Sequence, residues 1–539
     1  MKYFPDQAAH GIWARYAVVA LPLAYLAAAL LYSANTAPWG RQVDPESTYA
    51  MNGLVWAVGY PMMKNDHPGT TTILLAGIVI KLWSFLAGRS DVVEFGLRDF
   101  DAIVYASRAA EAVILSGVLL ASGVIVRNVT GSALAAMLFQ VAPFVHPEAM
   151  HFEVVLASEG PMVSCAILGM ALVLRAALGE RPPTTGLGAA LGLVFALGLS
   201  SKFLHFPLAL LGVSLLRSPR ALAVSFLTGI FSFFLFNRIF NPLVFTGGFR
   251  WLVSLATHRG IYGEGEPGFI DFKVFWPNMA EIVTSAPVIS GVFLLGAVVA
   301  LARMIKSRSF LDPVSLTLLA SCLAFAAQLV ATSKHFHLHY MTASWVLTGG
   351  VLVLTVVEIR RLVPAIAPAT VAGAAGLVGV VLISVSLFQL RQEAIRSIAL
   401  DNAAARLSKA VAAAGPSCAN VSGPYMRAPE DELNFAGDST LGIPEVQDRF
   451  AAAYRRAFQA PLLDYDASRD LLSRDFHATS FDRLAAEFPC IVVRAAREFD
   501  ASTSPGLTAL HPDHCVVGAV HVYAVGIACE KIRRTAENG

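Results

Sequence analysis

Residues 16–31 read YAVVALPLAYLAAALL and contain no charged side chain. Other apolar stretches follow along the chain, each roughly 14 to 26 residues long. A helix needs about 20 apolar residues to cross a bilayer. This pattern predicts a mainly α, polytopic transmembrane helix bundle. The further stretches begin near Thr70, Ile103, Ser132, Glu159, Thr184, Phe203, Ala221, Ala286, Pro313, Met341 and Ala365.

Composition supports a membrane protein. Hydrophobic residues make up 56% of the 539 residues and charged residues only 14%, whereas soluble domains carry about 25% charged residues. This hydrophobic content excludes a disordered chain. A net charge of +2 gives no basic surface for nucleic acid, so we expect membrane lipids and no nucleic acid among the partners.

Charge divides the chain into two parts. Residues 395–539 carry 15 Lys/Arg and 18 Asp/Glu, about 23%, against about 11% in residues 1–394. We therefore expect a membrane module over 1–394, with outer loops 35–69 and 238–285, and a small soluble α/β domain over 395–539. In that domain, CIVV at 490–493 and CVVGAVHVYAVGIAC at 515–529 alternate as strands do, and 444–459 has helical periodicity.

Cysteines follow the same division. Cys165 and Cys322 lie inside apolar runs, while the other four lie in the charged tail. Four cysteines in a small domain allow three disulfide pairings and fit an oxidising compartment. The alternative is four buried thiols. The tail cysteines are Cys418, Cys490, Cys515 and Cys529.

Basic residues in short turns predict the orientation, because such turns face the cytoplasm. Three turns qualify, together with the N-terminus and its Lys2 and Arg15. The soluble tail then lies outside, in the periplasm of a bacterial-type inner membrane. This arrangement needs an odd number of crossings, so the twelve runs predict eleven or thirteen. The three turns contain Arg217 and Arg220; Arg303, Lys306 and Arg308; and Arg360 and Arg361.

The first outer loop holds two acidic clusters at the predicted membrane boundary. It reads VDPESTYAMNGLVWAVGYPMMKNDHPGTTTILL at 43–75 and contains Asp44, Glu46 and the pair Asp66-His67. A carboxylate at this boundary can act as general base towards an acceptor hydroxyl. Helix capping is the alternative, because Asp is a good N-cap residue.

Lys202 interrupts two apolar segments in LGLSSKFLHFPLALL at 197–211. An ionisable residue in such a place indicates a functional site, and the compact charge of Lys suits a phosphate. The alternative is that Lys202 only extends to the interface.

Histidines form two predicted outer clusters. HPEAMHFE at 146–153 and SKHFHLHYM at 333–341 combine His with Glu or Tyr. Neither has the HExxH order, so we assign no metal ligands, and a divalent metal remains an alternative.

These motifs together resemble the GT-C superfamily of polyprenyl-phosphate-sugar glycosyltransferases, which includes protein O-mannosyltransferases and lipid A aminoarabinose transferases. Asp44-Pro45-Glu46 resembles the acidic pair of the first outer loop, and Asp66-His67-Pro68-Gly69 the His-Pro-Pro element. YASRAAEAVILSG at 105–117 resembles the helix that opens with an Arg, here Arg108. The 197–211 stretch resembles the Lys-aromatic element. Pro45 and Gly69 depart from the family pattern and leave the base and the subfamily open.

The resemblance implies an inverting transfer of a sugar from a polyprenyl-phosphate donor to an acceptor hydroxyl on the outer face. Asp44 is the expected base, with Glu46 as the competing residue. Asp66, His67, Arg108, Lys202, His339 and Tyr340 are expected to bind substrate, and no cofactor is assigned. The acceptor, a lipid, glycan or protein, stays open. The alternatives are a transporter or flippase of lipid-linked sugars and a scaffolding protein.

Overall fold

The computed structural model describes residues 4, 11–36, 46–63, 68–259, 266–415, 417–423, 433, 436–437, 440–458, 461–466, 470–495, 498, 505–518 and 520–538. The chain forms two compact units. The first comprises Met1–Tyr32, Lys64–Thr72 and Arg108–Gln392, and the second comprises Ser33–Met63, Ile73–Ser107 and Glu393–Gly539.

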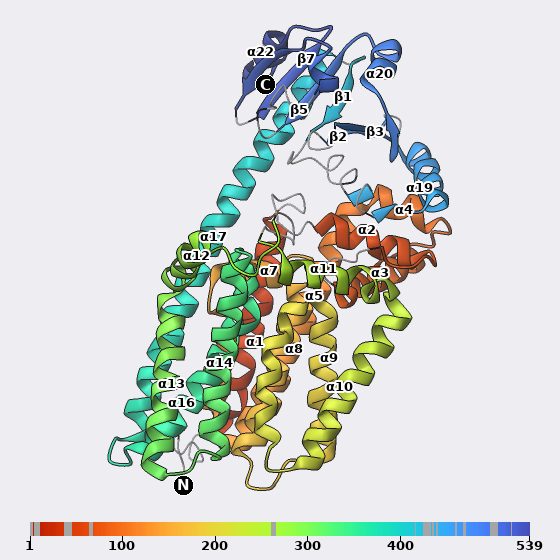
Figure 1. The fold of residues 1–539 in the computed structure, drawn as a ribbon. Coiled ribbons are helices and arrows are strands. Elements are labelled where there is room, and N and C mark those ends of the chain that lie inside the picture. The colour runs from red at the N-terminus through yellow and green to blue at the C-terminus, as the bar shows by residue number, and fades with distance from the viewer. Residues whose placement is uncertain are drawn as a thin grey trace. The chain divides into compact units, whose positions relative to one another are not determined.

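Long apolar helices build the first unit, where they run side by side (Figure 1). Among the described residues, seven helices are long and apolar enough to cross a membrane, and a bent pair makes eight. The bent pair joins Leu338–Trp345 to α16 (Thr348–Leu362) at 43°. The seven are α1 (Gly11–Ala34), α5 (Phe100–Thr130), α8 (Glu159–Leu178), α10 (Pro219–Phe240), α13 (Pro287–Ser307), α14 (Pro313–Lys334) and α17 (Pro368–Ala414).

Three apolar helices are shorter than a typical span, namely α3 (Thr70–Leu86), α9 (Thr185–Ser201) and the 3-10 helix η2 (Phe203–Leu215). The apolar run near Ser132 forms no spanning helix. It is divided among α6 (Ala133–Phe139), η1 (Ala142–Phe144) and α7 (Pro147–Val154). Pro143 and Pro147 explain the division, because proline is compatible with a helix start but not with its interior.

Turn chemistry sets the ends of several helices. Ser218 and Asp312 accept hydrogen bonds from the first turns of α10 and α14, and each precedes a proline at the first helical position.

Loop 238–285 contains helices of its own: η3 (Pro242–Phe245), α11 (Gly247–Thr257) and α12 (Phe272–Ser285).

Basic residues of the three predicted turns contact the ends of neighbouring helices. Arg217 donates to the carbonyls of Gly179 and Glu180, which follow α8. Lys306 donates to the carbonyl of Leu362 after α16, and Arg361 pairs with Asp312 before α14 at 2.7 Å. These turns therefore lie at one end of the bundle.

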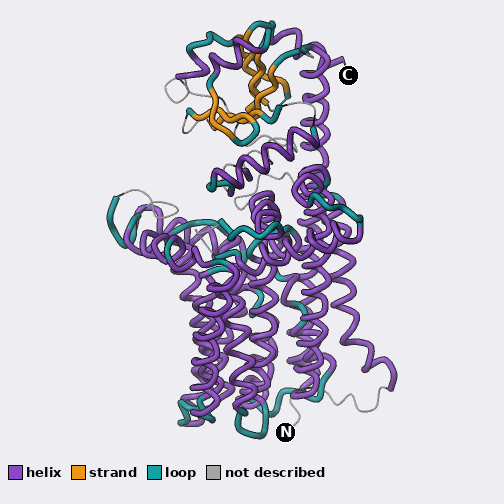
Figure 2. The backbone as a smooth tube through the Cα atoms, turned by 90° about the vertical axis from the view of Figure 1, so that its right-hand side faces the viewer, coloured by secondary structure: helices purple, strands orange, loops and turns teal. Residues whose placement is uncertain are grey.

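The second unit contains α2 (Glu46–Ala57), α4 (Val92–Arg98) and a seven-stranded sheet in the order β4-β3-β2-β1-β5-β7-β6. Figure 2 shows the strands gathered in one region. β1 is parallel to β2 and β5, and the other pairs are antiparallel. The strands are β1 (Ala419–Ser422), β2 (Leu463–Asp466), β3 (Leu471–Arg474), β4 (His477–Thr479), β5 (Ile491–Ala495), β6 (Asp513–Val517) and β7 (Val520–Val525).

Helices cover both faces of this sheet. On one face Phe481 and Leu484 of α20 (Phe481–Glu487) join the core with α21 (Pro505–Thr508). On the other, Leu407 and Val411 of α17 pack with Ile532 of α22 (Cys529–Asn538). The predicted helix at 444–459 is α19 (Pro444–Ala457). The predicted fold class, a transmembrane helix bundle with a small C-terminal α/β region, is confirmed.

All four tail cysteines form disulfides in one of the three open pairings. Cys418 pairs with Cys490 and Cys515 with Cys529. Cys165 and Cys322 are free thiols.

Candidate active site

The predicted site residues are distributed over both units. Asp44, Asp66 and His67 lie outside the described residues. Glu46 begins α2 in the second unit and is 1% exposed. The remaining predicted residues, Arg108, Lys202, His339 and Tyr340, belong to the first unit.

Lys202 lies at the break between two helices. α9 ends at Ser201, Lys202 adopts an extended backbone as its C-cap, and η2 follows directly. Pro207 inside the next segment disfavours an α-helix there. The break turns the Lys202 side chain into the bundle, where it is 3% exposed.

Glu159 holds the Lys202 ammonium. The distance from Lys202 Nζ to Glu159 Oε1 is 2.5 Å, and the Glu159 side chain is fully buried. Removing two charges from water costs several kcal/mol per ion, which a close pair offsets. Sequence analysis missed Glu159 as a site residue. In the sequence, Glu159 is an acidic residue in the first turn of an apolar helix. Acidic residues are common at this position because they interact favourably with the helix dipole, so the position does not indicate a site.

His339 and Tyr340 complete the cluster from a third element, η5 (Leu338–Met341). His339 Nε2 lies 3.7 Å from Glu159 Oε1, and Lys202 Nζ lies 4.8 Å from the centre of the Tyr340 ring. Phe152 of α7 stacks on His339 at 4.3 Å between ring centres. The structure thus brings three predicted residues together around Glu159.

Arg108 lies within α5 and is fully buried. Its charge acts on His151, whose Nδ1 is 2.6 Å from the Tyr32 hydroxyl. Burial of the ring is the larger cause, and the nearby charge of Arg108 the smaller, that together lower the pKa of His151 to about 3. His151 is therefore neutral at physiological pH.

A hydrogen-bond network fixes the segment that follows the Asp66-His67 pair. Gly69 N–H donates to the Ser201 carbonyl at 2.8 Å, and Asn241 donates to the Pro68 carbonyl at 3.0 Å. Asn237 accepts from Thr70 and donates to Ser200, both at 2.8 Å. The start of α3 is thereby tied to the residues directly before Lys202.

The two histidine clusters form no metal centre in the described part of the chain, where no group of three or more His, Cys, Asp or Glu side chains could hold a metal. His146 instead caps α7 by accepting from Glu148 N–H and packs on Trp345. His335 bonds to the Leu255 carbonyl at 2.8 Å.

All parts of the cluster come from helix ends. Glu159 starts α8, Lys202 follows α9, and His339 follows α14. The basic residue Arg217 contacts Gly179 at the other end of α8. A helix of 20 residues is about 30 Å long, the thickness of the hydrocarbon core of a bilayer. The cluster and the basic turns therefore lie at opposite ends of the bundle.

No protein-family model and no curated protein matches this chain. Among solved structures it is similar to ArnT from Cupriavidus metallidurans bound to undecaprenyl phosphate, with 16% identity over 94% of this chain and 98% of that chain and a TM-score of 0.45. The apo state of the same ArnT matches with 14% identity over 95% and 98% and a TM-score of 0.42.

Proposed function

We propose that this protein is a membrane glycosyltransferase that moves a sugar from a polyprenyl-phosphate donor to an acceptor hydroxyl at the outer face of the membrane. The observation that carries the proposal is the buried Lys202–Glu159 pair, completed by His339 and Tyr340. A buried cation at the membrane boundary suits the phosphate of a lipid whose chain stays in the bilayer.

The side of the membrane follows from charge. The basic turns lie at the end of the bundle opposite to the cluster. Because basic turns stay in the cytoplasm, the cluster faces outward. A site at helix ends also favours a transferase over a transporter, whose polar sites lie near the bilayer midplane.

In the proposed reaction, Asp44 takes the proton of the acceptor hydroxyl, with Glu46 as the competing base. The acceptor oxygen forms a bond to the anomeric carbon as the bond from that carbon to the phosphate oxygen breaks. The configuration inverts, and polyprenyl phosphate leaves as an anion. Lys202 stabilises the charge that develops on the phosphate. Arg108 assists Lys202 in stabilising this charge. Asp66 and His67 shape the sugar or acceptor site, and His339 and Tyr340 belong to the donor site.

The test separates donor binding from transfer. Protein in lipid nanodiscs receives a panel of radiolabelled polyprenyl-phosphate sugars and a membrane extract. We expect Asp44→Asn to bind the donor with unchanged affinity and to lose transfer by about 10²- to 10⁴-fold, the usual contribution of a general base. Lys202→Met should lose donor affinity, whereas Lys306→Met, in a basic turn, should lose neither.

Three results would contradict the proposal. Full transfer by both Asp44→Asn and Glu46→Gln would remove the assignment of the base. Equal donor affinity in Lys202→Met and wild type would remove the phosphate site. Movement of lipid-linked sugar across the bilayer, without transfer of any label, would establish the flippase alternative.

A further inference from the structure

We propose that His514 and His521, on the hairpin of β6 and β7, form a binding site for a borderline divalent transition-metal ion such as Zn²⁺ or Cu²⁺. This site is separate from the proposed transferase site and does not depend on it. Both side chains are accessible, since His514 is exposed and His521 is half-buried.

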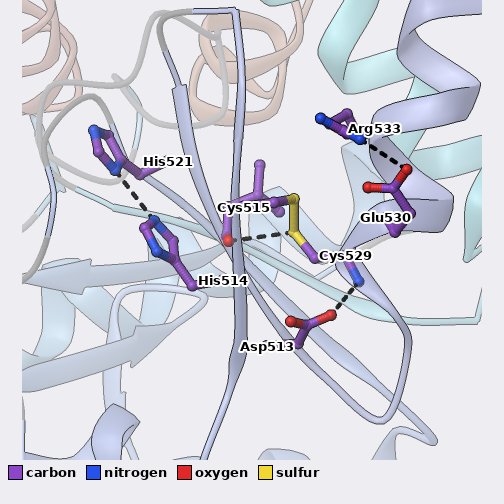
Figure 3. Close-up of a disulfide and its surroundings, with 8 residues drawn as sticks. Asp513, His514, Cys515, His521, Cys529, Glu530 and Arg533 are labelled. Atoms are coloured by element: carbon purple, nitrogen blue, oxygen red, sulfur yellow. Dashed lines mark hydrogen bonds and ion pairs between the residues drawn. A yellow bond between two sulfur atoms is a disulfide. The ribbon is translucent and has the colours of Figure 1, made fainter.

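The strand register brings the two rings together. His514 lies opposite Tyr523, and His521 lies opposite Val516. Residues two apart on a strand share a face, so both histidines lie on the same face of the hairpin, as diagonal neighbours. Figure 3 shows the two rings end to end, with His514 Nε2 and His521 Nδ1 3.2 Å apart.

This separation matches the spacing of two ligands on one metal ion. Zinc–imidazole bonds are about 2.0–2.1 Å long. Two nitrogens 3.2 Å apart would then enclose an angle of about 100° at the metal, between the square-planar angle of Cu²⁺ and the tetrahedral angle of Zn²⁺. Rotation of the two accessible rings, away from the line that joins the two nitrogens, would direct both lone pairs at the ion.

A change of tautomer allows both rings to bind the metal ion. One imidazole now donates its N–H to the other across the 3.2 Å contact. When the metal binds, the donor moves its hydrogen to its outer ring nitrogen through solvent, so both inner nitrogens present lone pairs. Water completes the coordination.

The backbone under the pair is held in place before any metal binds. Cys515 follows His514 and therefore points to the opposite face, where its disulfide to Cys529 ties β6 to the start of α22. Asp513 reinforces this tie by accepting from Cys529 N–H at 2.8 Å (Figure 3). The Tyr523 ring stacks on His514 at 4.5 Å.

The pair also has no competing use. Within the described residues, neither imidazole makes a second hydrogen bond or an ion pair. Sequence analysis missed the site because the two histidines are seven positions apart and match no metal motif. Only the hairpin register brings them together.

The experiment titrates CuCl₂ into the full-length protein in detergent, with any affinity tag removed, and records electron paramagnetic resonance spectra. We expect one Cu²⁺ per chain with two nitrogen ligands, which ZnCl₂ displaces. His514→Gln and His521→Gln should each lose this species. The control His511→Asn should keep it, because Asn tolerates the positive φ of 48° at this exposed position.

Circular dichroism and thermal unfolding check that the variants fold. In wild type, ZnCl₂ should raise the unfolding temperature of the C-terminal α/β region. In the double variant His514→Gln/His521→Gln, ZnCl₂ should leave this temperature unchanged. A two-nitrogen Cu²⁺ species that survives in the folded double variant would overturn the proposal. So would a wild-type protein that shows no such species.

Discussion

Lys202 and Glu159 define the candidate site at the scale of single residues. Each is buried, and each neutralises the other at 2.5 Å. Such a pair is a weak source of stability, because desolvation offsets most of the attraction. We therefore expect this pair, at a helix break in an apolar bundle, to serve the proposed binding of the donor phosphate.

Removal of the Lys202 charge leaves its partner without a counter-charge. Lys202→Met should destabilise the bundle by about 3–5 kcal/mol, because it leaves the Glu159 carboxylate buried without its cation. The double variant Lys202→Met/Glu159→Gln should recover most of this stability, since no isolated charge remains. It should still lack donor binding. Thermal unfolding in nanodiscs and a donor-binding assay measure the two effects separately.

Recovery of both stability and donor binding in the double variant would show that the pair is structural. The control is Arg361→Met/Asp312→Asn at the opposite end of the bundle, which removes the Arg361–Asp312 ion pair and the contact of Arg361 with Glu358. We expect the control to leave donor affinity unchanged.

Close packing of α9 on α10 explains how the helix that carries Lys202 is placed. Gly188 and Gly192 face the carbonyl oxygens of Ala221 and Ser225, and a Cβ atom at either glycine would overlap these oxygens. The spacing of four matches the small-residue pattern of close helix pairs in membranes. These glycines set the distance between the two helices.

Gly192→Ala should therefore force α10 away and destabilise the bundle by roughly 1–3 kcal/mol, the usual cost of overpacking. Gly291→Ala on α13 is the control, because no atom lies within 4 Å of a Cβ at that position. Thermal unfolding of the two variants in the same detergent measures the difference. Equal stability of both variants would contradict the proposed packing role.

At the scale of the whole chain, two disulfides cross-link the C-terminal α/β region. Cys418–Cys490 closes a separation of 72 residues, and Cys515–Cys529 one of 14. In the chain-entropy model, closing the longer loop stabilises by about 4 kcal/mol and the shorter by about 3. Cys418 also follows the long α17 and links its end to the strand β5.

Replacing Cys418 and Cys490 by Ala should thus lower the free energy of unfolding more than replacing Cys515 and Cys529. Denaturant unfolding of the full-length variants, followed by circular dichroism, measures the order. Mass spectrometry of unreduced peptides checks the pairing itself. Peptides that join Cys418 to Cys515 would refute it.

Composition and periodicity predicted the fold class. They also predicted eleven or thirteen crossings, whereas seven helices, or eight with the bent pair, are long and apolar enough to span a membrane among the described residues. Apolar runs and the rise in charge after residue 395 predict the helices and the α/β tail, because burial in lipid or in a core depends on side-chain polarity along the chain. Lys202 as a site candidate followed from a charged residue that interrupts apolar stretches, whereas His339 and Tyr340 followed from the resemblance to GT-C glycosyltransferases. Such interruptions are costly in a membrane and are visible in the chain itself.

Contacts between distant residues depended on the fold. Glu159 meets Lys202 across 43 positions, and His514 meets His521 through the register of a hairpin. Neither pair has a spacing that periodicity detects, because ion pairs and ligand sites form between elements. The division of the run near Ser132 and the choice among three disulfide pairings likewise came from packing. Local patterns specify which segments are buried, and only the three-dimensional arrangement specifies which side chains meet.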